Sequence, residues 1–255
     1  MGKPRKGNNG RKNGQPVVLK GLRKSFGSQV VLDGVDLEVA DGETLEVLGR
    51  SGTGKSVLLK LIIGLQPADA GTIRILGEEV TQLAPQQLNE IRKKIGFLFQ
   101  QGALYDSLTV EENVAFPISR HEKISDEERK ERVRELLAKV GMEKDLGKMP
   151  SEISGGMQKR VGLARALALD PGILLFDEPT SALDPITAAE IGKLILDLKE
   201  ERKMTAVVVT HDVHGAKHFA DRMVLLHEGK IMAEGSFEDL KRSKDPVVVQ
   251  FLRDA

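Results

Sequence analysis

The sequence contains no cysteine and no tryptophan, and it has a single tyrosine among its 255 residues. Without cysteine the chain forms no disulfide bond and offers no thiolate to a metal, which is typical of proteins from a reducing compartment. No apolar run approaches the roughly 18 residues that a membrane-spanning helix needs, and the N-terminus lacks the apolar core of a signal peptide. We therefore expect a chain that stays where it is made and meets a membrane only through a partner.

The sequence also lacks an excess of either charge, because 38 basic residues face 38 acidic ones. A neutral chain with few aromatic residues has neither the basic face nor the stacking platforms of a nucleic-acid surface, so no nucleic-acid partner is expected. The charges are unevenly placed, since residues 1–16 contain five basic residues and no acidic one. This Gly- and Asn-rich stretch is predicted to be a disordered basic tail, either simply solvated or in contact with anionic phosphate.

Short apolar runs rich in branched residues alternate with helical patterns, which is typical of a parallel sheet covered by helices. Glu46 interrupts the first run, so it either faces a polar neighbour or marks an edge strand. A hairpin with its turn at Glu228-Gly229 is expected after the last parallel strand. The predicted strands are "TLEVLG" (44–49), "KIGFLF" (94–99), "GILLF" (172–176) and "TAVVVT" (205–210), with a β-rich stretch before them (17–39) and the hairpin after them (223–235).

The middle of the chain, residues 101–160, shows no convincing strand and is predicted to be an inserted helical subdomain. Ser125 is a candidate helix cap, and Val133 begins an i, i+3, i+4, i+7 apolar pattern that Gly141 ends. The main domain is expected to span residues 17–240. Residues 241–255 form a helical extension in which Pro246 takes the first helical position; it docks on its own domain or on a neighbouring subunit.

The segment "GRSGTGKS" lies directly between a predicted strand and an apolar helix, as a Walker A phosphate loop requires. Its glycines let several backbone N–H groups point at one anion, and the helix start adds its positive dipole end. Lys55 is suited to the β- and γ-phosphates of a nucleotide and the Ser56 hydroxyl to Mg²⁺. The predicted phosphate-binding residues are Gly49, Arg50, Ser51, Gly52, Thr53, Gly54, Lys55 and Ser56.

The segment "ILLFDEP" places two acids at the end of a buried strand, at the sheet edge where α/β proteins bind ligands. Asp177 is predicted to hold Mg²⁺ through water. Glu178 is predicted to orient and deprotonate the attacking water as a general base. A surface turn would explain two acids equally well in isolation, but the phosphate loop favours the catalytic interpretation.

Together these motifs resemble those of the nucleotide-binding subunit of an ATP-binding-cassette transporter. The others are "FLFQ" ending in Gln100, "ISGGM" (153–157), "SALD" (181–184) and "VVVTHD" containing His211. The resemblance implies a P-loop NTPase with a RecA-like core, an N-terminal antiparallel β subdomain and an inserted helical subdomain. It also implies that ATP and Mg²⁺ are the ligands.

The same resemblance implies roles for four further residues. Gln100 would help to hold Mg²⁺ and would sense the γ-phosphate and the membrane partner. His211 would contact the γ-phosphate, and Asp184 would act across a dimer. Phe26 takes the place of the aromatic residue that stacks on adenine, although an ordinary core phenylalanine is an alternative.

Two glycines follow Ser154 where a helix begins, and nothing nearby in the sequence explains them. In the family that the motifs resemble, this stretch completes the nucleotide site of the opposite subunit. Ser154 and the N–H groups of Gly155 and Gly156 would form an anion cradle at the helix N-terminus. The chain is therefore expected to form a homodimer with two ATP molecules between the protomers.

Met157 stands where the usual signature has glutamine, which reflects either drift or a subfamily. "SGGM" with a following basic pair, "QQGALYDSLTVEENVAFP" (100–117) and "DPVVVQFL" together resemble the ATPases of Mla/Mce-type lipid transport systems. That resemblance implies membrane permease subunits, a periplasmic lipid-binding partner and a place on the cytoplasmic face of a bacterial inner membrane. Candidate permease contacts are Leu104, Tyr105, Leu108 and Val110, unless these fill the subdomain's own core.

Three other readings compete with the lipid-transport ATPase. The same cassette can energise another cargo, such as amino acids, lipoproteins or drugs. A non-transport regulator driven by ATP-dependent dimerisation is a second possibility. A third is a metal site, since His211, His214 and His218 are spaced by three and four residues, with Asp212 and Asp221 nearby. His211, however, directly follows a strand rather than lying on a helix.

Overall fold

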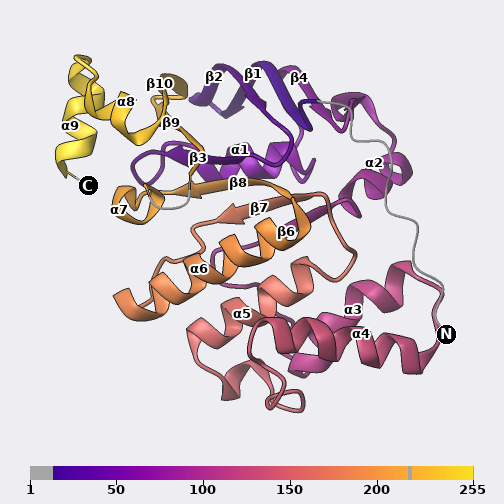
Figure 1. The fold of residues 1–255 in the computed structure, drawn as a ribbon. Helices are drawn as coiled ribbons and strands as arrows, with labels where there is room; N and C mark the ends of the chain where they lie inside the picture. The colour runs from indigo at the N-terminus through magenta and orange to yellow at the C-terminus, as the bar shows by residue number, and fades with distance from the viewer. Residues whose placement is uncertain (1–13, 218–219, 255) are drawn as a thin grey trace.

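A computed structural model describes residues 14–217 and 220–254 of the chain. Most of the predicted basic tail, residues 1–16, lies outside the described residues, as does His218. Two sheets and the helices around them form the fold (Figure 1). The larger sheet positions the functional residues. Its strands, in order across the sheet, are β10 (Lys230–Gly235), β9 (Arg222–His227), β3 (Thr44–Leu48), β8 (Thr205–Thr210), β7 (Ile173–Asp177) and β6 (Ile95–Leu98).

The larger sheet is parallel except at its hairpin edge, where β9 and β10 pair antiparallel. Strands β3, β6, β7 and β8 coincide with the four predicted apolar runs, because a strand covered on both faces needs near-continuous apolar residues. The hairpin turns at Glu228-Gly229 as predicted.

The smaller sheet is antiparallel and lies on the far side of helix α1 (Lys55–Ile62), which is sandwiched between the two sheets (Figure 1). Leu58, Leu59 and Ile62 of α1 are buried in one core that reaches both sheets. The sheet contains β1 (Val17–Phe26), β2 (Gln29–Val39), β4 (Ala70–Ile75) and β5 (Glu78–Glu79), and η1 (Val80–Gln82) and α2 (Pro85–Arg92) follow it.

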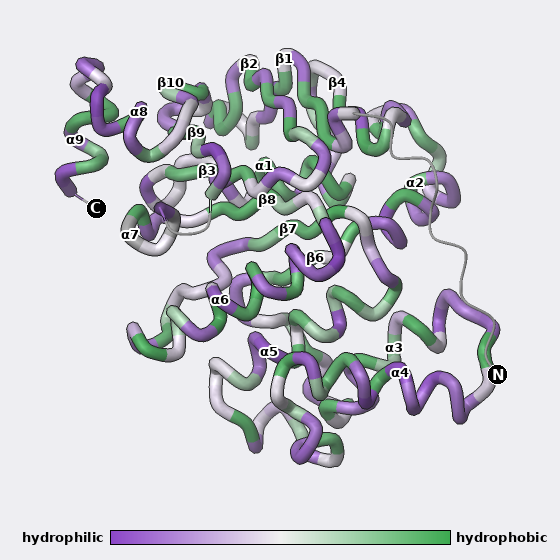
Figure 2. Tube along the Cα trace, in the orientation of Figure 1, coloured by the Kyte–Doolittle hydropathy of each residue, from purple (hydrophilic) through white to green (hydrophobic). Residues whose placement is uncertain are grey.

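Helices without an intervening strand join β6 to β7, a stretch of which every residue is described. They are α3 (Val110–His121), α4 (Asp126–Lys139), η2 (Pro150–Glu152) and α5 (Gly155–Ala166). Ser125 caps α4 by accepting a hydrogen bond from the Glu128 N–H, as its sequence pattern predicts. The colouring of Figure 2 shows α4 as largely hydrophilic, in contrast to the green strands of the sheet. Only its apolar stripe packs inward, and α5 joins that core to the sheet.

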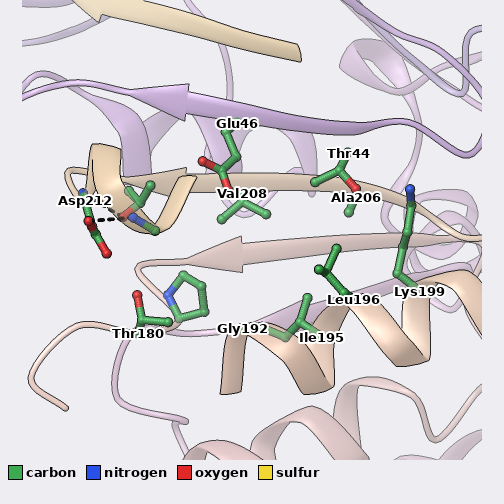
Figure 3. Close-up of a pocket in the computed structure, with 13 residues that line it drawn as sticks. Thr44, Glu46, Thr180, Gly192, Ile195, Leu196, Lys199, Ala206, Val208 and Asp212 are labelled. Atoms are coloured by element: carbon green, nitrogen blue, oxygen red, sulfur yellow. Dashed lines mark hydrogen bonds between the residues drawn. The ribbon is translucent and has the colours of Figure 1, made fainter. Parts of the chain in front are cut away.

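Glu46 does not mark an edge, because β3 lies between β8 and β9. Leu45 and Val47 face α1, so the alternation of a strand places Thr44 and Glu46 on the opposite face. There they line a cavity against α6 (Pro185–Arg202), whose wall is otherwise largely apolar (Figure 3). Glu46 Oε2 and Thr44 Oγ1 are buried without a hydrogen-bond partner among the described residues. Asp212 lines the same cavity, so Glu46 does have a polar neighbour, although its Oε2 makes no hydrogen bond there.

The C-terminal segment folds back onto its own domain. Helix α9 (Pro246–Asp254) buries Val248 and Phe251 in a small core with Met223 and Leu225 of β9. The short helices α7 (Val213–Ala216) and α8 (Phe237–Lys241) flank it. Through the described ranges, none of the helices combines the length and the apolar character needed to cross a bilayer.

Candidate nucleotide-hydrolysis site

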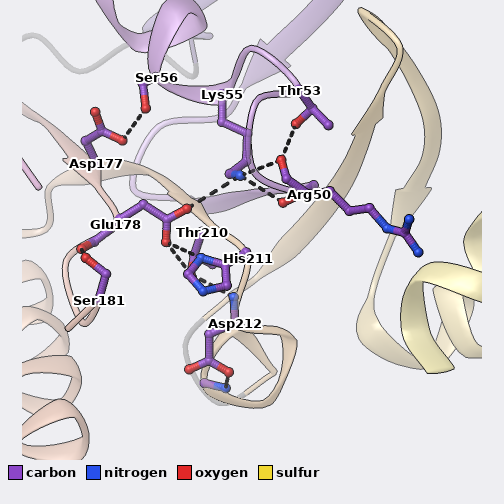
Figure 4. A network of polar contacts seen from close by, with 12 residues as sticks. Arg50, Thr53, Lys55, Ser56, Asp177, Glu178, Ser181, Thr210, His211 and Asp212 are labelled. Carbon is purple, nitrogen blue, oxygen red and sulfur yellow. Dashed lines mark hydrogen bonds and ion pairs between the residues drawn. The ribbon is translucent and has the colours of Figure 1, made fainter. Parts of the chain in front are cut away.

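The carboxyl ends of three neighbouring parallel strands meet at one place. β3 ends at Leu48 before the phosphate loop, β7 ends at Asp177, and β8 lies between them and ends at Thr210. Because parallel strands present their carboxyl ends at the same edge, residues about 130 positions apart become neighbours. Figure 4 shows their side chains converging there.

The glycines of the phosphate loop meet a geometric requirement. Gly54 has φ +99°, and a Cβ on it would lie 2.8 Å from Val31 Cγ1. A Cβ on Gly49 would lie 2.6 Å from the Leu226 carbonyl oxygen. Gly54 directly precedes α1, whose first N–H groups have no acceptor within the helix. The loop is thus a close-packed backbone turn with helix N–H groups at its end.

Lys55 turns back into this loop. Its Nζ donates to the carbonyl oxygens of Gly49, at 2.8 Å, and Arg50, at 3.1 Å. It also lies 3.5 Å from Glu178 Oε1. Burial lowers the pKa of the Lys55 ammonium, and Glu178 and Asp177 partly offset that effect. A cation is therefore held at the centre of the loop, next to an acid from β7.

Ser56 and Asp177 form the second pair. The Ser56 hydroxyl donates to Asp177 Oδ1 at 2.7 Å. Burial raises the pKa of the Asp177 carboxyl, while the hydrogen bond from Ser56 opposes that rise. The Ser56 hydroxyl and the Asp177 carboxylate thus place oxygen ligands side by side, which is a donor set suited to Mg²⁺.

Glu178 sits at the centre of the polar network (Figure 4). Its Oε2 lies 2.8 Å from His211 Nδ1 and 3.4 Å from the Thr210 hydroxyl. Its backbone is left-handed, with φ +49°, a conformation that residues other than glycine rarely adopt. The carboxylate therefore faces both Lys55 and His211 from a turn that departs from the strand direction.

The glycine pair after Ser154 packs against the start of α6. The Ser154 hydroxyl caps α5 by accepting from the Met157 N–H at 3.3 Å. A Cβ on Gly156 would lie 2.6 Å from Thr187 Cγ2, so a larger residue would push the two helices apart. Asp184 caps α6 through the N–H groups of Ile186 and Thr187, and hydrogen bonds from Thr187 lower its pKa.

Ser154, Gly155, Gly156 and Asp184 are thus close together, but they are apart from the phosphate loop. Within the described ranges, no hydrogen bond or ion pair joins any of them to residues 49–56. Gln100 is exposed in the turn after β6 and makes no such contact either. The predicted residues therefore form two separate groups on one chain.

The other predicted residues lie at the exposed rim. Phe26 ends β1 with 46% of its surface exposed, so it is not a core residue, and Lys24 Nζ lies 5.3 Å from its ring centre. The Thr53 hydroxyl donates to the Arg50 carbonyl at 2.9 Å. The Arg50 side chain pairs with Asp254 of α9. Ser51 and Gly52 are exposed at the tip of the loop.

Two residues near the site were not singled out from the sequence. Thr210 directly precedes His211 in the segment "VVVTHD". Its position at the end of the predicted strand was the signal that could have identified it. Lys159 belongs to the basic pair that follows "SGGM", but which member of the pair turns inward depends on the helix packing. In the structure Lys159 is 5% exposed and reaches the residues after β7.

The alternative metal site is not tested by the structure, because His218 and the side chain of His214 lie outside the described residues. Among the residues that the structure describes, no group of three or more His, Asp or Glu side chains is arranged to hold a metal ion. Asp212 instead caps α7 through the Gly215 N–H at 2.9 Å. His211 belongs to the sheet edge beside Glu178, as its position after β8 predicts.

An ATP-binding-cassette ATPase is the class of protein that this fold defines. The chain belongs to the ABC transporter family, whose profile matches residues 32–181. It is 45% identical over 239 residues to the probable ribonucleotide transport ATP-binding protein mkl of Mycobacterium leprae, covering 94% of this chain and 69% of that protein. It is 40% identical over 237 residues to the intermembrane phospholipid transport system ATP-binding protein MlaF of Haemophilus influenzae. That match covers 93% of this chain and 90% of MlaF.

A relative with a different named cargo matches nearly as well. The methionine import ATP-binding protein MetN of Rhizobium johnstonii is 42% identical over 219 residues, which is 86% of this chain and 60% of that protein. Among solved structures, the dimeric post-hydrolysis state of the ATP-binding cassette MJ0796 bound to ADP and Pi matches with a TM-score of 0.80. The two chains are 38% identical, and the match covers 98% of that chain and 86% of this one. The family and its ATPase class are thus shown, whereas the relatives' names differ in cargo.

Proposed function

We propose that the chain is the ATP-hydrolysing subunit of a lipid transporter and that it works as a homodimer. The observation that carries the hydrolytic part is the meeting of Lys55, Glu178 and His211 at the ends of β3, β7 and β8. Phosphoryl transfer to water needs a phosphate-binding group and a residue that positions or deprotonates the attacking water, and Lys55 and Glu178 are suited to these two roles. Phe26, at the exposed end of β1, is the proposed adenine platform.

The residues present fit Mg²⁺ as well as a nucleotide. Ser56 and Asp177 supply adjacent oxygen atoms, and Gln100 follows the neighbouring strand β6. When bound there, the ion would offset negative charge on the phosphates. The chain's own residues do the rest: the loop N–H groups and Lys55 bind phosphate oxygens, and Glu178 accepts the proton of the attacking water. His211 orients that carboxylate.

The separation of the second residue group supports a dimeric site. Ser154 and the N–H groups of Gly155 and Gly156 form an anion cradle that does not face the chain's own phosphate loop. In a homodimer it would face the γ-phosphate of the partner's ATP, with Asp184 alongside. Two nucleotides would then hold the protomers together until hydrolysis removes the shared contact. MJ0796 is a dimeric cassette in its solved structure, which supports the proposal of a dimer.

A groove beside the inserted helices is the proposed permease contact. It is lined by Phe97, Phe99, Tyr105, Phe116 and Arg165, among others. Tyr105 and Phe116 are 47% and 42% exposed, with ring centres 4.8 Å apart. Exposed aromatic residues around a concave surface are typical of a protein-binding site.

Of the four residues expected to contact a permease, one is placed elsewhere. Val110 is fully buried in the core of the helical subdomain, because its helix turns it inward after the Thr109 cap. Leu104 and Leu108 are partly buried, and Tyr105 is the exposed member. The proposed contact therefore centres on Tyr105 and Phe116 rather than on Val110.

The proposal of a lipid cargo depends on the likeness to MlaF, which extends over nine-tenths of both chains. The proposal includes permease subunits in a bacterial inner membrane and a periplasmic Mce-type lipid-binding partner. It also places the chain peripherally, on the cytoplasmic face of that membrane. An amino-acid cargo is the second candidate, because the sequence identity of this chain to MetN, 42%, is close to its identity to MlaF.

One experiment separates these cargoes. The tagged chain is purified from detergent-solubilised membranes of its native host, and its co-purifying proteins and lipids are identified by mass spectrometry. A permease together with an Mce-type protein and bound phospholipid supports the proposal. A permease with an amino-acid-binding protein supports the second candidate. Recovery of soluble partners alone would favour a non-transport regulator. The variant Tyr105→Ala should reduce permease recovery, and Tyr105→Phe is the matched control.

A further inference from the structure

A buried lysine on helix α5 reaches the peptide of Glu178. Lys159 Nζ donates to the Glu178 carbonyl at 3.2 Å and to the Ser181 carbonyl at 2.8 Å, and it lies 3.5 Å from the Ser181 hydroxyl. The residue is 5% exposed, and burial lowers the pKa of its ammonium to about 8. A charged group that is costly to bury is thus retained where an apolar side chain of similar length would fill the space.

The peptide that Lys159 binds is itself unusual. Glu178 has φ +49°, and such a conformation persists in a residue other than glycine only when surrounding contacts fix it. Its N–H donates to the Val209 carbonyl at 2.9 Å. Its carbonyl also accepts from the Ser181 hydroxyl at 2.9 Å and from the Ser181 N–H at 3.2 Å. The direction of the Glu178 side chain therefore depends on how firmly this carbonyl is held.

Lys159 also lies on the helix whose first residues form the proposed cradle for the partner's nucleotide. Ser154 caps α5, and Lys159 follows within the second turn of the same helix. The contacts of Lys159 are to carbonyl oxygens rather than to a carboxylate, so they hold the backbone of the loop. One rigid helix thus connects the cradle at its N-terminus with the peptide of the chain's own Glu178.

We propose that Lys159 is a positioning residue that holds the peptide of Glu178, and with it the carboxylate, in the geometry needed for hydrolysis. Through α5 it ties this carboxylate to the cradle at Ser154. The proposal rests on the function proposed above, in which Glu178 acts as the base. It assigns to Lys159 an effect on the hydrolytic step and none on the binding of ATP, because Lys159 contacts neither the phosphate loop nor Phe26.

The variant Lys159→Met tests the proposal by replacing the ammonium with an apolar side chain of similar length. We expect kcat for ATP hydrolysis to fall at least tenfold, with KM for ATP changed less than threefold. Ser181→Ala removes a second donor to the same carbonyl and should lower kcat in the same direction, but less. Lys193→Met, at an exposed position of α6, is the matched control and should leave both constants unchanged.

Chemical rescue separates positioning from simple damage to the fold. The chain has no cysteine, so Lys159→Cys carries its only thiol, and alkylation with bromoethylamine during refolding rebuilds an ammonium on an arm of nearly lysine length. We expect the aminoethylated protein to recover most of the lost kcat, while alkylation with iodoacetamide does not restore it. A kcat of Lys159→Met equal to that of the unmodified chain would overturn the proposal. So would a loss that aminoethylation fails to reverse.

The failure of this proposal can be told from failure of the proposed function. If Glu178→Gln hydrolyses ATP at the normal rate, the role of Glu178 itself is wrong. If Glu178→Gln is inactive but Lys159→Met is fully active, only the role of Lys159 is wrong. If Lys159→Met does not fold, as judged by circular dichroism and thermal unfolding, Ser181→Ala and the aminoethylated Lys159→Cys protein provide the test. A normal kcat in Ser181→Ala together with failed rescue then overturns the proposal.

Discussion

His211 Nδ1 lies 2.8 Å from Glu178 Oε2, so the residue expected to contact the γ-phosphate is in direct contact with the proposed base. The two residues come from the ends of β8 and β7, neighbouring strands of the sheet. The imidazole therefore fixes the direction of the carboxylate as long as this bond is kept.

This contact predicts that changes at the two positions are not additive. His211→Ala should lower kcat about 100-fold, because the carboxylate loses the group that orients it. Glu178→Gln/His211→Ala should be little slower than Glu178→Gln alone, since residues in contact share their effect. Phosphate release from the four proteins of the cycle measures the coupling. Strictly multiplicative losses would show that the two side chains act independently.

Glu178→Gln should nearly abolish turnover while leaving nucleotide binding intact. Loss of a general base typically costs about 10²–10⁴ in rate, and the amide keeps the shape of the side chain. With Mg-ATP this variant should accumulate as a dimer, seen by sedimentation velocity, because the shared phosphate is not removed. Asp197→Asn, an exposed acid on α6, is the control and should behave as the unmodified chain.

The cradle at Ser154 can be tested with two substitutions that separate its role as a helix cap from its proposed role in phosphate binding. Ser154→Ala removes the helix cap and should destabilise the fold by about 1 kcal/mol. Ser154→Asp keeps a good cap, but it places a negative charge where the partner's phosphate is proposed to bind. Ser154→Asp should therefore unfold at the normal urea concentration and yet fail to form the ATP-dependent dimer in the Glu178→Gln background. Normal dimer formation by that variant would place the phosphate elsewhere.

Glu46 should make the fold less stable as the pH rises. Burial, and then the charge of Asp212, raise its pKa from 4.5 to about 8. Between these values the folded chain holds a proton that the unfolded chain has released. The stabilisation is thus fully present below pH 4.5 and is lost as the pH approaches 8.

The size of this effect follows from the pKa shift. Between pH 5.5 and pH 8 the loss should be about 3 kcal/mol, at about 1.4 kcal/mol per pH unit. Glu46→Gln, which does not titrate, removes this contribution, so the difference in unfolding free energy between the two proteins isolates it. Urea unfolding at both pH values measures that difference. A difference that stays constant with pH would mean that Glu46 is charged, and therefore partnered, in the fold.

Sequence patterns predicted the strands and the helix caps because these depend on nearby residues. The apolar runs ending at Leu48 and Asp177 are long enough for buried strands and are bounded by turn residues. Ser125 followed by acids is a local cap signal, and the structure confirms it. The strand, the glycine-rich turn and the helix around residues 49–56 could be predicted for the same reason, since they are consecutive in the sequence.

Features that depend on contacts between segments far apart in the chain could not be predicted from local sequence patterns. Glu46 gave no sign of its cavity, because the facing wall comes from α6, about 140 residues further along the chain. The burial of Lys159 rather than Arg160 depends on the rotation of α5 against the loop after β7. Val110 was a candidate permease contact with the subdomain's own core as the alternative, and it is fully buried, since α3 packs onto α4 and α5.

Helix α9 brings the end of the described chain to the phosphate loop, where Asp254 pairs with Arg50. Anything fused after this helix, such as an affinity tag or a fluorescent protein, would emerge beside Arg50 and the proposed nucleotide site. Kinetic constants measured on C-terminally tagged protein would then describe a partly obstructed entrance. Such a fusion would also be well placed to report on nucleotide entry by energy transfer.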